Sequence, residues 1–124
     1  DVMSIARYEA ADVINIKINK YGLGNARKMA AVAEAAGLPC MVGAMMSTGV
    51  SVAAGLHFCA ANDFPYPTEQ DGALLLQDDT LAGNPYSAVT ADRCWPVPEG
   101  PGLGVQLKPA YENALNAQLE GTRP

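Results

Sequence analysis

Apolar and polar residues alternate in the segment Asp12-Val-Ile-Asn-Ile-Lys-Ile18. One face of the strand that this pattern predicts carries Ile14, Ile16 and Ile18, and the other carries Val13, Asn15 and Lys17. Because only two of these residues are polar, we expect a strand of a parallel sheet with both faces largely covered. Lys17 then lies near the carboxyl end of the strand, where α/β sheets and (β/α)8 barrels carry their chemistry. The alternative is a lysine whose ammonium simply reaches water along the strand end.

Spacings of three and four residues between apolar positions predict the helices of the chain. These helices cover residues 2–10, 26–36, 49–60 and 109–119. Asn25 is placed to cap the second of them, and Gly37 to end it in the left-handed conformation. Ser47 or Thr48 can cap the third helix, and His57 within that helix is interpreted as a structural residue.

Two further short segments predict strands, Cys40–Gly43 and Thr68–Asp71. Strands and helices therefore alternate, which favours an α/β fold with a parallel sheet. Residues 80–100 show no clear period and contain several prolines. We interpret residues 1–124 as one partial domain, in which 80–124 form an irregular closing segment and a terminal helix.

Composition and charge exclude several classes of partner. The chain has 124 residues and a net charge of −5, and no cluster of Lys and Arg favours nucleic acid. No apolar run reaches the roughly 18 residues of a membrane span. The three cysteines, Cys40, Cys59 and Cys94, lack zinc-site spacing. We interpret them as reduced, buried thiols of a cytoplasmic protein.

Several motifs, in order along the chain, resemble one enzyme family. Asp12-Val-Ile-Asn-Ile-Lys17 with Lys20, followed by Ala33-Glu-Ala-Ala-Gly37, resembles the sixth strand and helix of the enolase superfamily, in its mandelate racemase and muconate lactonizing enzyme group. The seventh strand, its loop and its helix are matched by Met41–Met46 and Ala53–His57, the eighth strand by Pro67-Thr-Glu69 with Gly72 and Leu74–Leu76, and the C-terminal signature by Gly100–Gly104. The resemblance implies the C-terminal part, about strands 6 to 8 with their helices, of a (β/α)8 TIM-type barrel, which takes about 250 residues when complete.

The resemblance also implies a reaction. These enzymes remove the proton α to a substrate carboxylate, using a Lys or His base and Mg²⁺. Lys17 matches the acid/base lysine, and Glu69 matches an acidic residue that hydrogen-bonds the substrate carboxylate. Glu69 can equally be a solvated loop residue. The family's metal ligands and second acid/base residue belong to earlier strands, so we expect Mg²⁺ in the complete enzyme and no metal ligand in this chain.

Other positions bear on the substrate, which the family match implies to be a small carboxylate. The substrate contacts expected from the match are Asn15, Met45, Ser47 and Asp71. Asp71 could instead form, with Glu69, the acidic pair by which dipeptide epimerases hold a substrate ammonium, although the alignment through Gly72 argues against it. Ser47 replaces a common glutamate and Ala73 a common proline, and these departures leave the substrate open.

Two hypotheses for the whole follow. In the first, the chain is the C-terminal portion of a Mg²⁺-dependent racemase, epimerase or cycloisomerase. It would be inactive alone, and it would associate with the rest of the barrel or with itself, as a homo-oligomer. In the second, it is a stand-alone, non-catalytic domain or assembly module in which Lys17 is structural or binds an anion.

Overall fold

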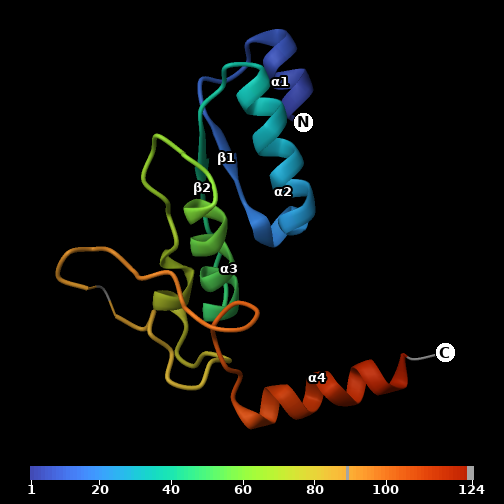
Figure 1. Ribbon diagram of the computed structural model, residues 1–124, viewed down its shortest axis with the longest axis vertical. Helices are drawn as coiled ribbons and strands as arrows, with labels where there is room; N and C mark the ends of the chain where they lie inside the picture. Colours follow the sequence, from blue (N-terminus) through green and yellow to red (C-terminus); the bar gives the residue numbers. More distant parts are fainter. Residues whose placement is uncertain (89, 123–124) are drawn as a thin grey trace.

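The computed structural model describes residues 1–88 and 90–122. In chain order the elements are α1 (Val2–Tyr8), β1 (Ile14–Ile16), α2 (Ile18–Ala35), β2 (Cys40–Val42), α3 (Gly49–Ala60), the 3₁₀ helix η1 (Asp71–Leu75) and α4 (Pro109–Gly121) (Figure 1). The four helices and the first two strands thus form in the regions that the hydrophobic pattern predicts, with shorter strands and an earlier start for α2. Val89 and the last two residues, which belong to the expected closing segment, lie outside the described residues.

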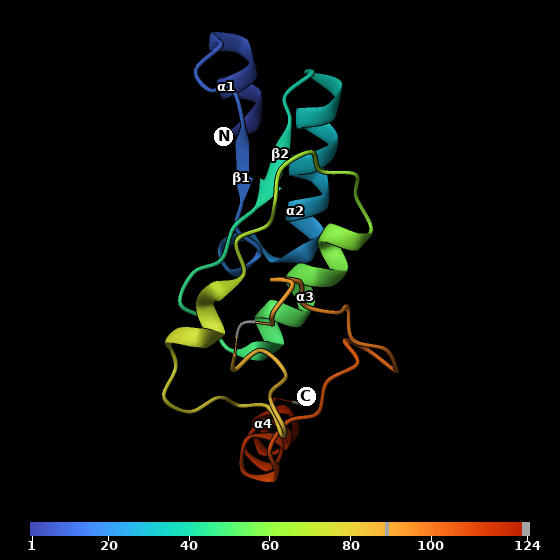
Figure 2. The same ribbon diagram turned by 90° about the vertical axis from the view of Figure 1, so that its left-hand side faces the viewer.

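The two strands form a small parallel sheet. Ile14 lies beside Cys40 and Ile16 beside Val42, and α2 lies behind the sheet (Figure 2). A parallel pair needs a crossover connection, and α2 supplies it. This βαβ unit puts the carboxyl ends of both strands at the same edge of the sheet.

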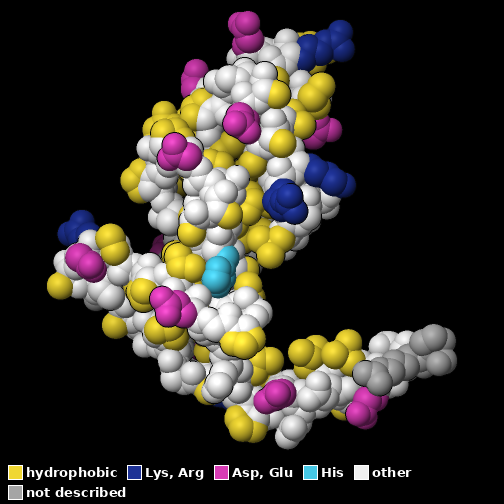
Figure 3. Space-filling model, in the orientation of Figure 1, with side chains coloured by type: hydrophobic (Ala, Val, Ile, Leu, Met, Phe, Trp, Pro, Cys, Tyr) yellow, Lys and Arg dark blue, Asp and Glu magenta, His cyan; other side chains and the backbone are white. Residues whose placement is uncertain are grey.

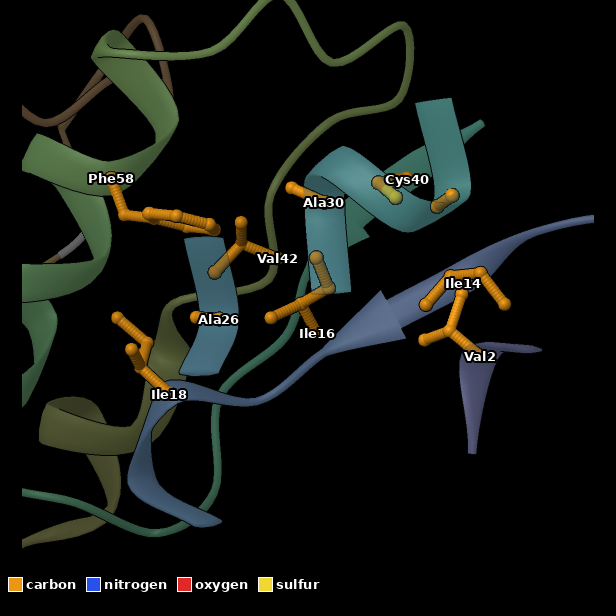
Figure 4. Close-up of a cluster of buried hydrophobic side chains, with 10 residues drawn as sticks. Val2, Ile14, Ile16, Ile18, Ala26, Ala30, Cys40, Val42 and Phe58 are labelled. Atoms are coloured by element: carbon orange, nitrogen blue, oxygen red, sulfur yellow. The ribbon is translucent and has the colours of Figure 1, made fainter. Parts of the chain in front are cut away.

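The core forms two clusters. The first fills the space between the sheet and the helices (Figure 4), and its buried members are Val2, Ile14, Ile16, Ile18, Ala26, Ala30, Ala33, Cys40, Val42 and Phe58. The second joins α3 to the closing segment, through Val52, Ala53, Leu56, Ala73, Leu81 and Tyr86. Small residues on α2 allow close packing on the strands, so the isoleucine face of β1 is fully covered.

The other face of β1 differs from the expectation. Ile14 and Ile16 are buried, but Asn15 between them is exposed. The prediction of a strand covered on both faces is therefore wrong for this chain. The helices pack on the isoleucine side, and the side that carries Asn15 and Lys17 stays accessible.

The start of α2 also differs from the prediction. The helix begins at Ile18, directly after β1, and Gly22 interrupts it with φ 70° and ψ 161°. Asn25 therefore lies inside the element and does not cap it. Its side chain instead donates a hydrogen bond to the Tyr21 carbonyl at 3.0 Å. Glycine at position 22 makes this kink possible because it lacks a Cβ.

The end of α2 follows the prediction. Gly37 has φ 69°, its N–H donates to the Glu34 carbonyl, and the Leu38 N–H donates to the Ala33 carbonyl at 2.9 Å. These two bonds form a Schellman motif, which satisfies carbonyls at the helix end.

The predicted last strand does not form. Residues 68–70 are irregular, and Asp71 begins η1. The segment nevertheless lies beside the end of β2, because the Glu69 N–H and the Thr68 hydroxyl both donate to the Val42 carbonyl. A single contact point is too little for a ladder, since the chain turns into η1 two residues later.

The three cysteines differ in their exposure to solvent. All three thiols are free, but only Cys40 is buried, whereas Cys94 is exposed, which corrects the expectation of three buried thiols. Burial raises the pKa of the Cys40 and Cys59 thiols.

Within the described residues, no helix combines the length and apolar character needed to cross a bilayer.

Candidate functional site

Lys17 lies where β1 ends. Its backbone is still extended, with φ −110° and ψ 100°, and the next residue begins α2. The side chain is half-buried, and its Nζ donates a hydrogen bond to the Ala44 carbonyl at 2.7 Å. The ammonium is thus held over the carboxyl edge of the sheet, across the end of β2.

The acceptor belongs to the loop between β2 and α3, residues 43–48, which we call the β2–α3 loop. The loop is joined to the sheet at its start, because the Gly43 N–H donates to the Ile16 carbonyl at 3.0 Å. A Cβ at position 43 would lie 2.3 Å from Oδ1 of Asn15. The Asn15 side chain therefore rests against Gly43, on the same accessible face as Lys17.

The middle of the β2–α3 loop packs against η1. A Cβ at Gly72 would lie 2.2 Å from the Met45 carbonyl oxygen and 2.8 Å from Oγ of Ser47. Only glycine permits this close approach of two backbones. The contact brings Met45 and Ser47 next to the helix that Asp71 begins.

The predicted acidic residues lie at this edge but stay open to solvent. Glu69 is exposed and is tied to the site by its backbone N–H, while Asp71 is exposed at the start of η1. The structure thus brings all six predicted residues around the β2–α3 loop. Of these side chains, those of Lys17 and Asn15 are held by atoms of that loop, Ala44 O and Gly43.

The described residues do not form a magnesium cradle. Among residues 1–88 and 90–122, no three His, Cys, Asp or Glu side chains gather closely enough to hold a metal ion. The donor set around Lys17 therefore does not fit Mg²⁺, which takes carboxylate and water oxygens in octahedral geometry. We assign no chemical step in this chain to a metal.

A groove of about 860 Å³ lies away from these residues. It is lined by parts of α2 and α3 and by the approach to β2, including Arg27, Leu38 and Phe64. This is the amino end of β2, whereas Lys17 lies at the carboxyl ends. The cavity is therefore not part of the candidate site.

Two side chains outside the six predicted residues connect α3 to other parts of the chain. The sequence analysis did not single out the first, Asp79, and interpreted the second, His57, as structural. Asp79, which is only 8% exposed, accepts a hydrogen bond from the N–H of Gly49, the first residue of α3, at 2.7 Å. No local pattern could reveal this bond, because its partners are 30 residues apart. His57, interpreted from the sequence as structural, has its Nε2 3.2 Å from the Leu103 carbonyl and so links α3 to the closing segment.

Comparison with known proteins places this geometry in a family. Residues 1–111 match the family described as "Enolase C-terminal domain-like". The chain belongs to this family. Its relatives include muconate cycloisomerase 1 of Rhodococcus opacus, 39% identical over 109 residues (86% of this chain and 28% of the relative), and an L-Ala-D/L-Glu epimerase of Bacillus subtilis, 37% identical over 103 residues (82% and 27%).

A solved structure agrees with the sequence relatives. The N-succinyl Arg/Lys racemase of Bacillus cereus superposes with a TM-score of 0.74 at 31% identity, covering 94% of this chain and 30% of the racemase. Enzymes of the mandelate racemase and muconate lactonizing group contain a TIM barrel. This chain matches part of that barrel fold. The chain spans less than a third of the length of these relatives. Members of the superfamily generally use Mg²⁺, act on small carboxylates and catalyse racemisation, epimerisation or cycloisomerisation.

Proposed function

We propose that this chain is the C-terminal part of an enolase-superfamily isomerase and that Lys17 is its acid/base residue on strand 6 of the barrel. The observation that carries the proposal is the position of the Lys17 ammonium, half-buried at the carboxyl edge of a parallel sheet and bonded to the Ala44 carbonyl. Barrel enzymes carry their reacting groups at this edge. In this view β1 and β2 are strands 6 and 7, and residues 68–70 occupy the place of strand 8.

The main contribution of this chain to the proposed reaction is one side chain, Lys17, that accepts and returns a proton. The neutral amine of Lys17 takes the proton α to the substrate carboxylate, and the C–H electron pair moves into the carboxylate as an enediolate. The ammonium so formed returns the proton to the face from which it came, or to the carbon left by a ring closure, whereas delivery to the opposite face needs the family's second acid/base residue, which the resemblance places on an earlier strand. The abstraction needs the neutral amine, because only its free electron pair can take the proton.

Asn15, Met45, Ser47 and Glu69 are proposed to contact the substrate. When it carries a proton, the carboxyl group of Glu69 can donate a hydrogen bond to the substrate carboxylate while negative charge develops there. Asp71 has the alternative role of pairing with Glu69 around a substrate ammonium. The two roles predict different substrates, a carboxylate without an ammonium group or a dipeptide with one. A panel of substrates therefore distinguishes them.

The chain alone should not turn over. This chain covers only 28% of the length of muconate cycloisomerase 1 of Rhodococcus opacus, and the described residues here contain no metal-binding cluster. We therefore expect no exchange of α-hydrogens into deuterated water by the 124-residue chain, with Mg²⁺ and candidate acids present.

The decisive test uses the protein of the full reading frame. Deuterium uptake at the α-carbon is followed by proton NMR for a panel of N-acyl amino acids, dipeptides and muconates. Lys17→Ala should lower the exchange rate by about 10²–10⁴-fold, the usual contribution of a general base. Lys28→Ala, which removes an exposed lysine of α2, is the matched control and should leave the rate unchanged. Equal rates in wild type and Lys17→Ala would overturn the proposal, and a full-length product with no upstream barrel would favour the stand-alone module.

A further inference from the structure

Asp79 is the one acidic side chain buried among the described residues, and it is far in sequence from the helix that it caps. Its Oδ2 accepts the Gly49 N–H at 2.7 Å, and its Oδ1 accepts the N–H of Leu81 at 3.0 Å. Thr48, the residue in the capping position of α3, makes no side-chain bond to the helix. The carboxylate of Asp79 therefore takes over the capping role, where the helix dipole favours a negative charge.

The capped residue, Gly49, directly follows the β2–α3 loop. That loop is held at three places: by the Gly43 N–H on the Ile16 carbonyl, by the contact of Met45 and Ser47 with Gly72, and by Asp79 on Gly49. Between the first two places lies the Ala44 carbonyl, the acceptor for Lys17. A loop of six residues fixed at its start, middle and end has little freedom left, so its carbonyls keep their positions.

Asp79 itself is fixed by the closing segment. The N–H of Ala82 donates to the Gln106 carbonyl, and that of Lys108 donates to the Thr80 carbonyl at 2.8 Å. Leu81, next to this pairing, is buried against Gly49. The segment that looked irregular in sequence thus clamps the N-terminus of α3.

We propose that Asp79 is a positioning residue for Lys17. By holding Gly49 it fixes the β2–α3 loop, and through the Ala44 carbonyl it fixes the place of the Lys17 ammonium. Its consequence for catalysis rests on the proposed function, but its effect on Lys17 does not. The neighbouring acid has no such role, because Asp78 is exposed and pairs with Lys108 on the surface.

Competitive lysine acetylation tests the proposal on the 124-residue chain. Under native conditions, mass spectrometry gives the labelling rate of Lys17 relative to Lys28 in the same tube. Asp79→Asn keeps the shape of the side chain but removes its negative charge. It also replaces one of the two oxygens that accept the N–H groups of Gly49 and Leu81. We expect the Lys17 to Lys28 ratio to rise at least about 3-fold, as the loop opens locally and releases the ammonium.

Two controls separate positioning from general loss of stability. Asp78→Asn removes a neighbouring charge and should leave the ratio unchanged. Val52→Ala removes two methyl groups from the buried face of α3 but keeps the backbone hydrogen bonds of the loop and the Asp79 carboxylate, and should also leave the ratio unchanged. A ratio that stays constant in Asp79→Asn, or that rises equally in Val52→Ala, would overturn the inference. If Asp79→Asn does not fold, Asp79→Glu gives the same comparison, with a rise of the ratio expected because the carboxylate is displaced by one methylene.

The full-length protein gives the second readout. Asp79→Asn should lower kcat more than it changes KM, because a displaced amine costs the transition state more than the bound substrate. Restoring the carboxylate with Asp79→Glu should recover part of the loss. A raised labelling ratio without any α-hydrogen exchange, in wild type or variants, would leave the positioning role standing and reject the proposed function alone.

Discussion

At the scale of single residues, the site depends on two glycines that lack a side chain as much as on the side chains that are present. Lys17 supplies the reacting nitrogen, but Gly43 and Gly72 create the space in which Asn15 and the β2–α3 loop lie. The alternation of apolar and polar residues was enough to predict that Lys17 ends a strand. The Ala44 carbonyl that holds it could not be predicted, because it belongs to the β2–α3 loop, 27 residues away in sequence, and carries no side-chain signal.

Gly72 provides a test of this packing. Gly72→Ala would force its Cβ into the Met45 carbonyl, and we expect the free energy of unfolding to fall by about 1–3 kcal/mol, the usual cost of overpacking. Gly24→Ala is the matched control, because no atom lies within 4 Å of its Cβ and its backbone is not left-handed. That change should be neutral or stabilise α2 by up to about 1 kcal/mol. Urea unfolding of both variants measures the difference, and a neutral Gly72→Ala would show that the contact is loose.

At the scale of elements, local patterns predicted what local interactions form. The helices follow from their apolar spacing, and the end of α2 follows from Gly37. The start of α2 was misplaced because a first turn at Ile18 precedes the kink at Gly22. The last strand was wrongly predicted because backbone contact with the β2–α3 loop turns the chain at Gly72 into η1. The second error occurs where a tertiary contact overrides propensity.

The junction before α4 gives a prediction about pH. The hydrogen bond from Lys108 lowers the pKa of Asp78, and the same bond raises the pKa of Lys108. A lowered carboxyl pKa adds stability above its ordinary value of 3.8, and this stability is lost as pH falls through the lowered value. A raised amine pKa adds stability below 10.5, which is lost as pH rises through the raised value.

The pair therefore stabilises the fold between these limits. Since both groups are solvated, the effect should be small. Asp78→Asn should lower Tm slightly at pH 7 in low salt, and the difference should shrink in high salt and shrink again as the pH falls below 3.8. Thermal melts over this range of pH and salt measure the difference. A difference that does not change with pH or salt would mean that Asp78 acts through packing and not through charge.

At the scale of the whole molecule, two surfaces remain open. One is the face of the sheet that carries Asn15 and Lys17, and the other is α4, which projects from the body and buries none of its residues (Figures 1 and 3). Tyr111, Leu115 and Leu119 follow one another at four-residue spacing along α4 and are 43–52% exposed. A helix of this length is marginal in water without a packing partner, the usual minimum being about 12–15 residues.

We therefore expect the 124-residue chain to self-associate when it is alone. Light scattering after size exclusion should give a mass that rises with concentration, because exposed apolar rows pair. Replacing Leu115 and Leu119 by serine should reduce this association without changing the fold of α1 to η1. Glu112→Gln, on the same helix, serves as the control. A monomer at every concentration would reject the expectation.

The amine at position 17 can be tested most directly by removing and rebuilding it. In the full-length protein, Lys17→Cys should abolish α-hydrogen exchange, and alkylation with bromoethylamine should restore a large part of it by recreating an amine of nearly the same length. Wild-type protein treated in the same way controls for Cys40, Cys59 and Cys94. Our account predicts loss followed by rescue. Exchange that survives Lys17→Cys before alkylation would show that another group carries the proton.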